Sequence, residues 1–236
     1  MKICEQFATL QGEGKYVGVP SFFIRTTGCN LRCAWKNPDG SITRCDTPYS
    51  SWEPEHGGEV DVNAIIDLCD ERNINHIVIT GGEPMLQPDI EEVAKAFIKK
   101  DFIVTIETNG TIYKDIPGAF FSISPKLKSS YSQVKGSREA RMHENNNKHL
   151  LESLKALIHH KHQLKFVVNT EDDINEINMI LQKIGDDNSN VYLMPQGITE
   201  EQFKQKQKMM FDLCMEYGFN YTPRLHIDIF GNKRGV

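Results

Sequence analysis

The sequence contains no long apolar segment and no surplus of basic residues. Nowhere in its 236 residues is there an uninterrupted apolar run of about 18 residues, which a membrane-spanning helix needs. Lysine and arginine total 27 against 32 aspartate and glutamate residues, so the formal net charge is −5. Proteins that bind nucleic acid through its phosphates carry the opposite surplus. The composition therefore predicts neither a membrane protein nor a general nucleic-acid binder.

The N-terminus also lacks the pattern of a secretion signal. The segment "MKICEQFATLQGEG" has no charged region followed by an apolar one. In the reducing cytoplasm, clustered thiols hold metal more often than they form disulfides. We therefore expect a cytoplasmic protein whose clustered cysteines bind metal.

The six cysteines fall into two groups by their sequence context. Cys69 and Cys214 lie on apolar stripes at helical spacing, which predicts core positions. Cys4 lies in an expected first strand, where a structural role is the simplest interpretation. Cys29, Cys33 and Cys45 remain as a cluster of potential ligands.

Short apolar runs rich in β-branched residues alternate with helical patterns along the chain. The runs are residues 21–25, 76–80, 102–108, 120–124, 164–168 and 191–194, and helical stripes occupy 90–98, 150–158 and 174–184. This alternation predicts repeated βαβ units and a mostly parallel sheet in an α/β fold. About six such units can close into a barrel or remain partly open, and periodicity does not decide between them. We expect a single domain, residues 1–236.

The distinctive motifs follow the predicted strands. The cysteine loop follows residues 21–25, "TGGEP" follows 76–80, "ETNG" ends 102–108, and "SPK" follows the run that begins at Phe120. Since active sites of parallel α/β folds lie at the carboxyl ends of the strands, the site is expected there.

Two polar segments interrupt the pattern. Residues 36–44, "KNPDGSITR", are rich in turn formers and predict a surface turn or hairpin. Residues 128–148 are polar and weakly patterned, which predicts a long, irregular and mobile loop.

Three thiols leave two metal sites open as interpretations. A structural zinc takes four ligands, and the histidine nearest in sequence to Cys45 is His56. An iron–sulfur cubane can instead use three protein thiolates and leave one iron open for reaction.

The cysteine loop resembles that of radical S-adenosylmethionine (radical SAM) enzymes. Their cysteines are separated by three and then by two residues. Here "GCNLRCAW" keeps the first spacing, and residues 36–44 are inserted before "CDT". "TGGEPML" is similar to the superfamily motif that contacts the amino group of SAM, where adjacent glycines allow close backbone approach. The resemblance implies a partial or modified (β/α)-barrel and a 4Fe-4S cluster held by Cys29, Cys33 and Cys45.

A narrower resemblance spans nearly the whole chain. "FATLQGEGKYVGVPSFFIRTTGCN", "CDT", "TGGEPML", "IETNGT", "ISPK" and "LHIDIFGNKRGV" resemble the 7-carboxy-7-deazaguanine synthase family of queuosine-precursor biosynthesis. The family resemblance implies a lyase that converts 6-carboxy-5,6,7,8-tetrahydropterin to 7-carboxy-7-deazaguanine with loss of ammonia. In that chemistry, a radical generated from SAM takes a hydrogen atom from the substrate, and SAM is regenerated.

The same resemblance implies the residues of the site. The substrate residues would be Leu10, Gln11, Gly12, Arg25 and Thr80, and the SAM residues Gly82, Ser124, Pro125, Lys126, Met194, Pro195, Gln196 and Gly197. Arg25 would grip the substrate carboxylate, because a guanidinium binds a carboxylate through two parallel hydrogen bonds. Thr47 would offer a hydroxyl to Mg²⁺, a cation that prefers oxygen ligands.

The resemblance further implies an electron donor such as flavodoxin or ferredoxin, and a homodimer. Two other functions stay open: a different radical SAM enzyme such as a glycyl-radical activase, and a non-catalytic metal-cluster protein. Several polar residues also have structural interpretations that need no role in a site. Arg25 could pair with a surface acid, Glu13 could be a turn residue, and His159, His160 and His162 could form a solvated helix end.

Overall fold

A nine-stranded sheet forms the centre of the protein in the computed structural model, which describes residues 1–37, 40–131 and 136–236. Its strands, in spatial order, are β11 (Asn220–Tyr221), β10 (Val191–Pro195), β9 (Lys161–Val168), β8 (Phe120–Ile123), β7 (Ile103–Thr108), β6 (His76–Gly81), β2 (Pro20–Thr26), β1 (Lys2–Leu10) and β5 (Gly58–Glu59). Within the described ranges the order ends at β11 and β5, so the sheet stays open as a partial barrel.

Most of this sheet is parallel. Every neighbouring pair from β2 to β11 is parallel, and within this nine-stranded sheet only β1 with β2 and β1 with β5 are antiparallel among the described residues. β1 reverses into β2 through the short turn η1 (Gly14–Tyr16), which leaves no room for the crossover that parallel neighbours need. The six predicted apolar runs overlap β2 and β6 to β10, so the predicted fold class is confirmed.

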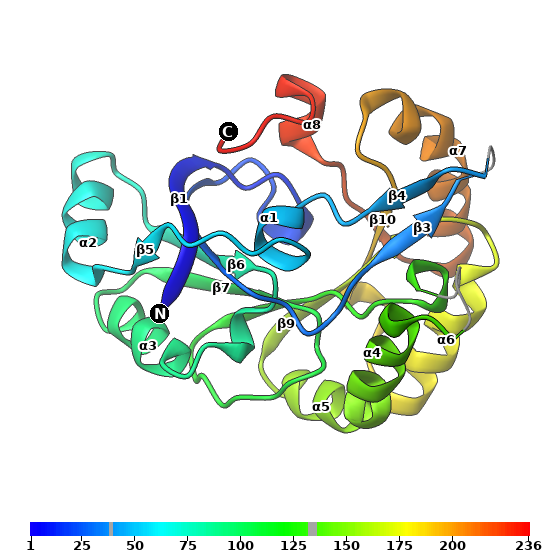
Figure 1. Ribbon diagram of the computed structural model, residues 1–236, viewed down its shortest axis with the longest axis horizontal. Helices are drawn as coiled ribbons and strands as arrows, with labels where there is room; N and C mark the ends of the chain where they lie inside the picture. Colours follow the sequence, from blue (N-terminus) through cyan, green and yellow to red (C-terminus); the bar gives the residue numbers. More distant parts are fainter. Residues whose placement is uncertain (38–39, 132–135) are drawn as a thin grey trace.

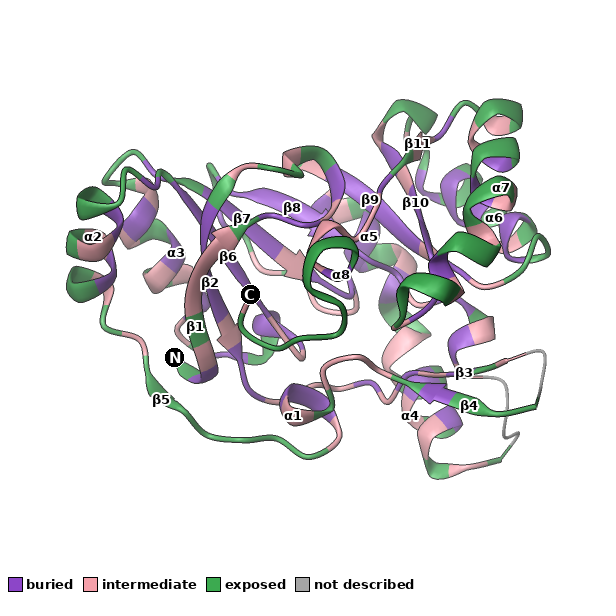
Figure 2. Cartoon of the chain, turned by 90° about the horizontal axis from the view of Figure 1, so that it is seen from above, coloured by how far each residue is buried: buried purple, intermediate pink, exposed green. Residues whose placement is uncertain are grey.

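Helices follow one another around the outside of the sheet (Figure 1). They are α2 (Val62–Glu71), α3 (Ile90–Ile98), α5 (Leu150–Leu157), α6 (Asp173–Ile184) and α7 (Glu200–Tyr217). Their buried residues repeat at helical spacing, as Ile90, Ala94 and Phe97 do in α3. Figure 2 shows these buried faces turned toward the strands, with exposed residues on the solvent side.

Several further elements are short. They are α1 (Pro48–Ser51), α8 (Leu225–Phe230), η2 (Pro84–Leu86) and η5 (Asn188–Asn190). Within the described ranges, no helix combines the length and apolarity that crossing a membrane requires.

The segment inserted before Cys45 belongs to a hairpin. β3 (Ala34–Lys36) pairs antiparallel with β4 (Ile42–Arg44), which confirms the predicted hairpin. Residues 38–39 lie outside the described part of the chain.

The prediction of an irregular loop at 128–148 is wrong for much of that segment. Short turns η3 (Lys128–Ser130) and η4 (Asn147–His149) flank the helix α4 (Arg138–Asn146), and residues 132–135 lie outside the described ranges. The hydroxyl of Ser137 caps α4 by accepting from the backbone N–H of Ala140. The helix carries no apolar stripe, so its periodicity could not be detected in the sequence.

The cysteines outside the loop occupy the expected places. Cys69 is fully buried in α2, Cys214 packs partly buried against the core, and Cys4 lies buried in β1. The expected solvated histidine cluster is wrong at His162. This residue belongs to β9 and pairs with Asp186 at 2.7 Å, with only 8% of its side chain exposed.

Candidate active site

A cavity of about 660 Å³ lies at the carboxyl ends of the strands. It is lined by Leu10, Gln11, Gly12, Arg25, Cys29, Cys33, Cys45, Thr47, Thr80, Gly82, Ser124, Lys126, Met194, Pro195, Gln196 and Gly197. These are the residues singled out in the sequence, with one exception. Pro125 is buried and is not among the residues that line the cavity, and its contact with SAM stays a prediction.

The hairpin brings the displaced third cysteine back to the second. Ala34 pairs with Arg44 at the base of β3 and β4, and the backbone N–H of Cys45 donates to the carbonyl of Cys33 at 3.1 Å. Most of the inserted residues that the structure describes are exposed, and the two cysteines become neighbours across the hairpin. The number of residues between Cys33 and Cys45 does not show this proximity, because the antiparallel pairing of β3 with β4 sets the distance between the two cysteines.

A small apolar cluster surrounds the three thiols. Its buried members are Leu31, Cys33 and Trp35, and Cys29, Cys45 and Val167 pack against them. Burial raises the pKa of Cys29 to about 12 and also raises the pKa of Cys33. Metal ligation at these two positions must therefore displace protons.

All three thiols line the same cavity. Among the described residues, no three His, Cys, Asp or Glu side chains are placed to share one metal ion. Thiolates of a cubane bind different irons and need not converge on one point. The indole N–H of Trp35 supports a bound group: it is buried without a partner in the described ranges, although Trp35 lines the cavity.

The "TGGEP" turn packs directly on the cysteine loop. A Cβ on Gly82 would lie 2.1 Å from the carbonyl oxygen of Gly28 and 2.6 Å from that of Ser50, so only glycine fits. The next residue, Glu83, is fully buried and was given no role from the sequence. It accepts from the Thr108 hydroxyl at 2.7 Å and the Asn109 N–H at 2.7 Å, which ties this turn to the end of β7.

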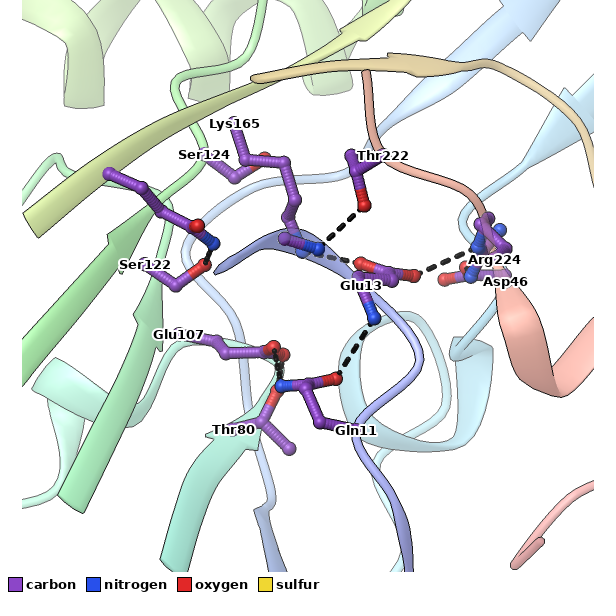
Figure 3. A network of polar contacts seen from close by, with 12 residues as sticks. Gln11, Glu13, Asp46, Thr80, Glu107, Ser122, Ser124, Lys165, Thr222 and Arg224 are labelled. Carbon is purple, nitrogen blue, oxygen red and sulfur yellow. Dashed lines mark hydrogen bonds and ion pairs between the residues drawn. The ribbon is translucent and has the colours of Figure 1, made fainter. Parts of the chain in front are cut away.

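Glu13 lies at the centre of a buried ionic network (Figure 3). It pairs with Lys165 of β9 and with the Nε of Arg224 at 2.9 Å. Arg224 also pairs with Asp46 and donates to the carbonyl of Gly197 at 3.1 Å. Burial alone would raise the pKa of Glu13, but Lys165 and Arg224 outweigh it and hold the pKa well below its usual range. Glu13 does lie at the start of the η1 turn, as one interpretation had it, and its side chain in addition joins this ionic network.

A second carboxylate gathers two predicted substrate residues. Glu107, at the end of β7, accepts from Gln11 Nε2 at 3.1 Å and from the Thr80 hydroxyl at 2.8 Å (Figure 3). Gln11 also accepts the backbone N–H of Glu13 at 3.2 Å, which connects the two networks. Sequence reasoning missed Glu107, although an acid at the carboxyl end of an apolar strand was a usable signal.

Arg25 combines both interpretations drawn from the sequence. Its Nε donates to Glu5 at 2.6 Å, and Glu5 also accepts from the Tyr49 hydroxyl at 3.1 Å. Its guanidinium lies 6.0 Å from the ring centre of Phe7. Its terminal nitrogens carry no hydrogen bond within the described ranges, and the residue lines the cavity. Arg25 thus pairs with an acid and still offers donors.

Two lysines donate hydrogen bonds to the segments that the family resemblance implies as SAM-binding. Lys126 donates to the Ser124 hydroxyl at 2.8 Å. Lys206 of α7 donates to the carbonyl of Gln196 at 2.9 Å and to its side-chain oxygen at 2.8 Å. It also donates to the side chain of Asn169, so the residue after β10 is held from the helix side.

Comparisons with known proteins agree with this geometry. Residues 23–184 match the radical SAM superfamily. The chain is 37% identical to the 7-carboxy-7-deazaguanine synthase of Rhodopirellula baltica, over 99% of this chain and 88% of that protein. It is 36% identical to the enzyme of that name from Halobacterium salinarum, over 98% and 91%.

Two solved structures share the fold. QueE from Escherichia coli has a TM-score of 0.67 at 23% identity, covering 95% of this chain and 94% of that one. TYW1 with a lysine-pyruvate adduct has a TM-score of 0.55 at 16% identity, covering 84% and 72%.

Proposed function

Because this chain belongs to the 7-carboxy-7-deazaguanine synthase family of the radical SAM superfamily, we propose that it converts 6-carboxy-5,6,7,8-tetrahydropterin to 7-carboxy-7-deazaguanine and ammonia. The observation that carries the proposal is the cavity at the carboxyl ends of the strands. It gathers the three thiols, the segments similar to SAM-binding motifs and a polar pocket of suitable chemistry.

Cys29, Cys33 and Cys45 are the residues that would hold the 4Fe-4S cluster. When bound, the cluster and SAM supply the radical chemistry of the reaction. Leu31 and Trp35 pack against the three cysteines and make their surroundings partly apolar. Gly82, Ser124, Lys126 and the segment 194–197 would bind SAM, with Lys206 and Arg224 fixing that last segment from behind.

The polar pocket suits a carboxylated pterin. Glu107 already accepts two hydrogen bonds, and a carboxylate has about four acceptor positions, so it can also accept from a pterin N–H. Gln11 and Thr80 hold this carboxylate in place. Arg25 offers its free guanidinium nitrogens to the substrate carboxylate, and Leu10 and Gly12 complete the wall.

Magnesium is part of the proposal through Thr47. Its hydroxyl lies 3.4 Å from Cys45 Sγ and lines the cavity beside Asp46. There a hard cation would offset the charge of a substrate carboxylate. We expect magnesium removal, or Thr47→Val, to slow turnover at least tenfold without changing iron content, while Thr47→Ser keeps most activity. Equal turnover with and without magnesium would remove this role.

An electron donor such as flavodoxin or ferredoxin and a homodimeric state complete the proposal. Both rest on the family resemblance. A glycyl-radical activase would share the thiols and "GGEP", but it has no use for a small pocket built on Glu107 and Gln11. A non-catalytic cluster protein has no use for either.

The test is an anaerobic assay of reconstituted protein with 6-carboxytetrahydropterin, SAM, magnesium and a strong reductant, following deazapurine and ammonia. We expect product from the wild-type chain and from the control Cys214→Ala, and none from Cys45→Ala. Reductant-dependent cleavage of SAM without deazapurine would keep the radical chemistry and discard the substrate. A colourless protein without iron would discard both.

A further inference from the structure

The polar helix α4 lies beside the β3–β4 hairpin in both views of the molecule (Figures 1 and 2). The longer helices around the sheet pack apolar faces on it, but the buried residues of α4 are Ala140 and His143. The contacts that hold α4 in place are thus largely polar, and they lead to the loop between Cys29 and Cys33.

His143 is the first of these contacts. Its Nε2 accepts the backbone N–H of Arg32 at 3.1 Å, between the two cysteines. The side chain is fully buried, and the ring of Tyr131 stacks on it with 4.5 Å between centres. The acceptor nitrogen therefore has a fixed position.

Asn146, one helical turn further, makes a reciprocal pair with the loop. Its amide nitrogen donates to the carbonyl of Asn30 at 3.0 Å, and the side chain of Asn30 donates back at 3.1 Å. On the other side, Asn30 accepts from Asn109 at 2.9 Å and donates to Thr111 at 2.8 Å. Asn30 is thus held between α4 and the segment after β7.

These contacts supply hydrogen-bond partners for the backbone of the cysteine loop. Residues 28–33 belong to no helix or strand, so their backbone groups need partners from elsewhere when the chain covers them. The side chain of Arg32 serves two carbonyls, those of Cys29 and Leu31, at 2.8 Å each. The N–H of Arg32 and the carbonyl of Asn30 depend on α4.

We propose that α4 is a clamp on the cysteine loop, in which His143 and Asn146 are positioning residues that keep Cys29 and Cys33 in their ligating arrangement. Cluster retention then depends on side chains that touch neither iron nor substrate. The inference rests on the cluster of the proposed function and is independent of the substrate. Outer contacts of this kind change metal affinity on the order of 10- to 100-fold.

The test distinguishes the hydrogen-bond acceptor of His143 from the packing of its ring. His143→Phe keeps an aromatic ring against Tyr131 but removes the acceptor, whereas His143→Gln carries an oxygen that can reach the N–H of Arg32. His149→Phe is the matched control, because His149 is 78% exposed. The readouts are iron and sulfide per chain after anaerobic reconstitution, and the rate of iron loss to a chelator.

We expect His143→Phe to lose iron about tenfold faster than wild type, and both other variants to behave like wild type. Equal retention by His143→Phe would overturn the clamp. Equal loss by the Phe and Gln variants would assign the effect to packing and also overturn it. No substrate is present, so a variant series that follows our expectation stands even if the wild type makes no deazapurine.

Discussion

Arg224 contacts three segments that are remote from one another in the sequence. It pairs with Glu13 near the N-terminus and with Asp46 after the third cysteine, and it donates to the carbonyl of Gly197 after β10. Only 9% of its side chain is exposed. One guanidinium therefore aligns the expected substrate, cluster and SAM segments, and its planar fork makes the separate contacts possible.

Replacing Arg224 should therefore affect binding and folding differently in two variants. Arg224→Met removes the cation that pairs with Asp46 and leaves Glu13 with Lys165 alone, so it should lower the free energy of unfolding by about 3–5 kcal/mol. Arg224→Lys keeps one charge but cannot make all the contacts, so we expect at least tenfold weaker SAM binding with a smaller loss of stability. Urea unfolding and equilibrium dialysis measure the two effects. Unchanged SAM affinity in Arg224→Lys, with exposed Arg72→Lys as control, would refute the alignment.

At the scale of elements, the β3–β4 hairpin compensates for the inserted residues. Its pairing brings Cys45 to Cys33, and Trp35 anchors it in the small apolar cluster around the thiols. Trp35 is only 8% exposed, whereas Ile42 on the same hairpin is 50% exposed. The hairpin is therefore anchored through Trp35 of β3, whereas Ile42 of β4 faces solvent.

Trp35→Ala should release the hairpin from this cluster. Loss of a buried tryptophan costs about 3–5 kcal/mol, and a loosened β3 no longer holds Cys45 beside Cys33. We expect lower stability in denaturant titration and less iron per chain after reconstitution. Ile42→Ala is the control and should match wild type in both. Full iron content in Trp35→Ala would show that the third cysteine does not depend on the anchored hairpin.

At the scale of the whole molecule, buried neutral histidines make stability depend on pH. His76 is fully buried, with hydrogen-bonding contacts to Ser21 at 2.7 Å and Thr105 at 2.8 Å. Burial lowers its pKa from 6.5 to about 4. Between pH 6.5 and about pH 4, the His76 side chain is therefore protonated in the unfolded chain but stays neutral in the folded protein. This contribution to stability is complete above pH 6.5 and is lost as the pH falls toward 4.

The expected loss from His76 is at most about 3 kcal/mol over that window. We expect the free energy of unfolding in urea to fall more steeply with decreasing pH in wild type than in His76→Gln. The exposed His149→Gln should leave the slope unchanged. Identical slopes for wild type and His76→Gln would show that His76 does not carry this dependence.

Local patterns in the sequence were sufficient for the frame of the protein. The β-branched runs and helical stripes are properties of neighbouring residues, so they predicted β2, β6 to β10 and the outer helices. Strand ends of a parallel sheet share one edge, so the motifs following those strands predicted a common site. The predicted residues indeed line one cavity, except for buried Pro125.

Tertiary structure alone decided the contacts between remote segments. Glu13 meets Lys165 and Arg224, and Asn30 meets Asn146, across separations that no local pattern encodes. Helix α4 was missed because polar contacts with the cysteine loop hold it, and a hydrophobic period cannot reveal such a helix. Charged side chains and buried amides pair with groups that lie near them in space, and these remote segments come near one another only after the sheet has formed.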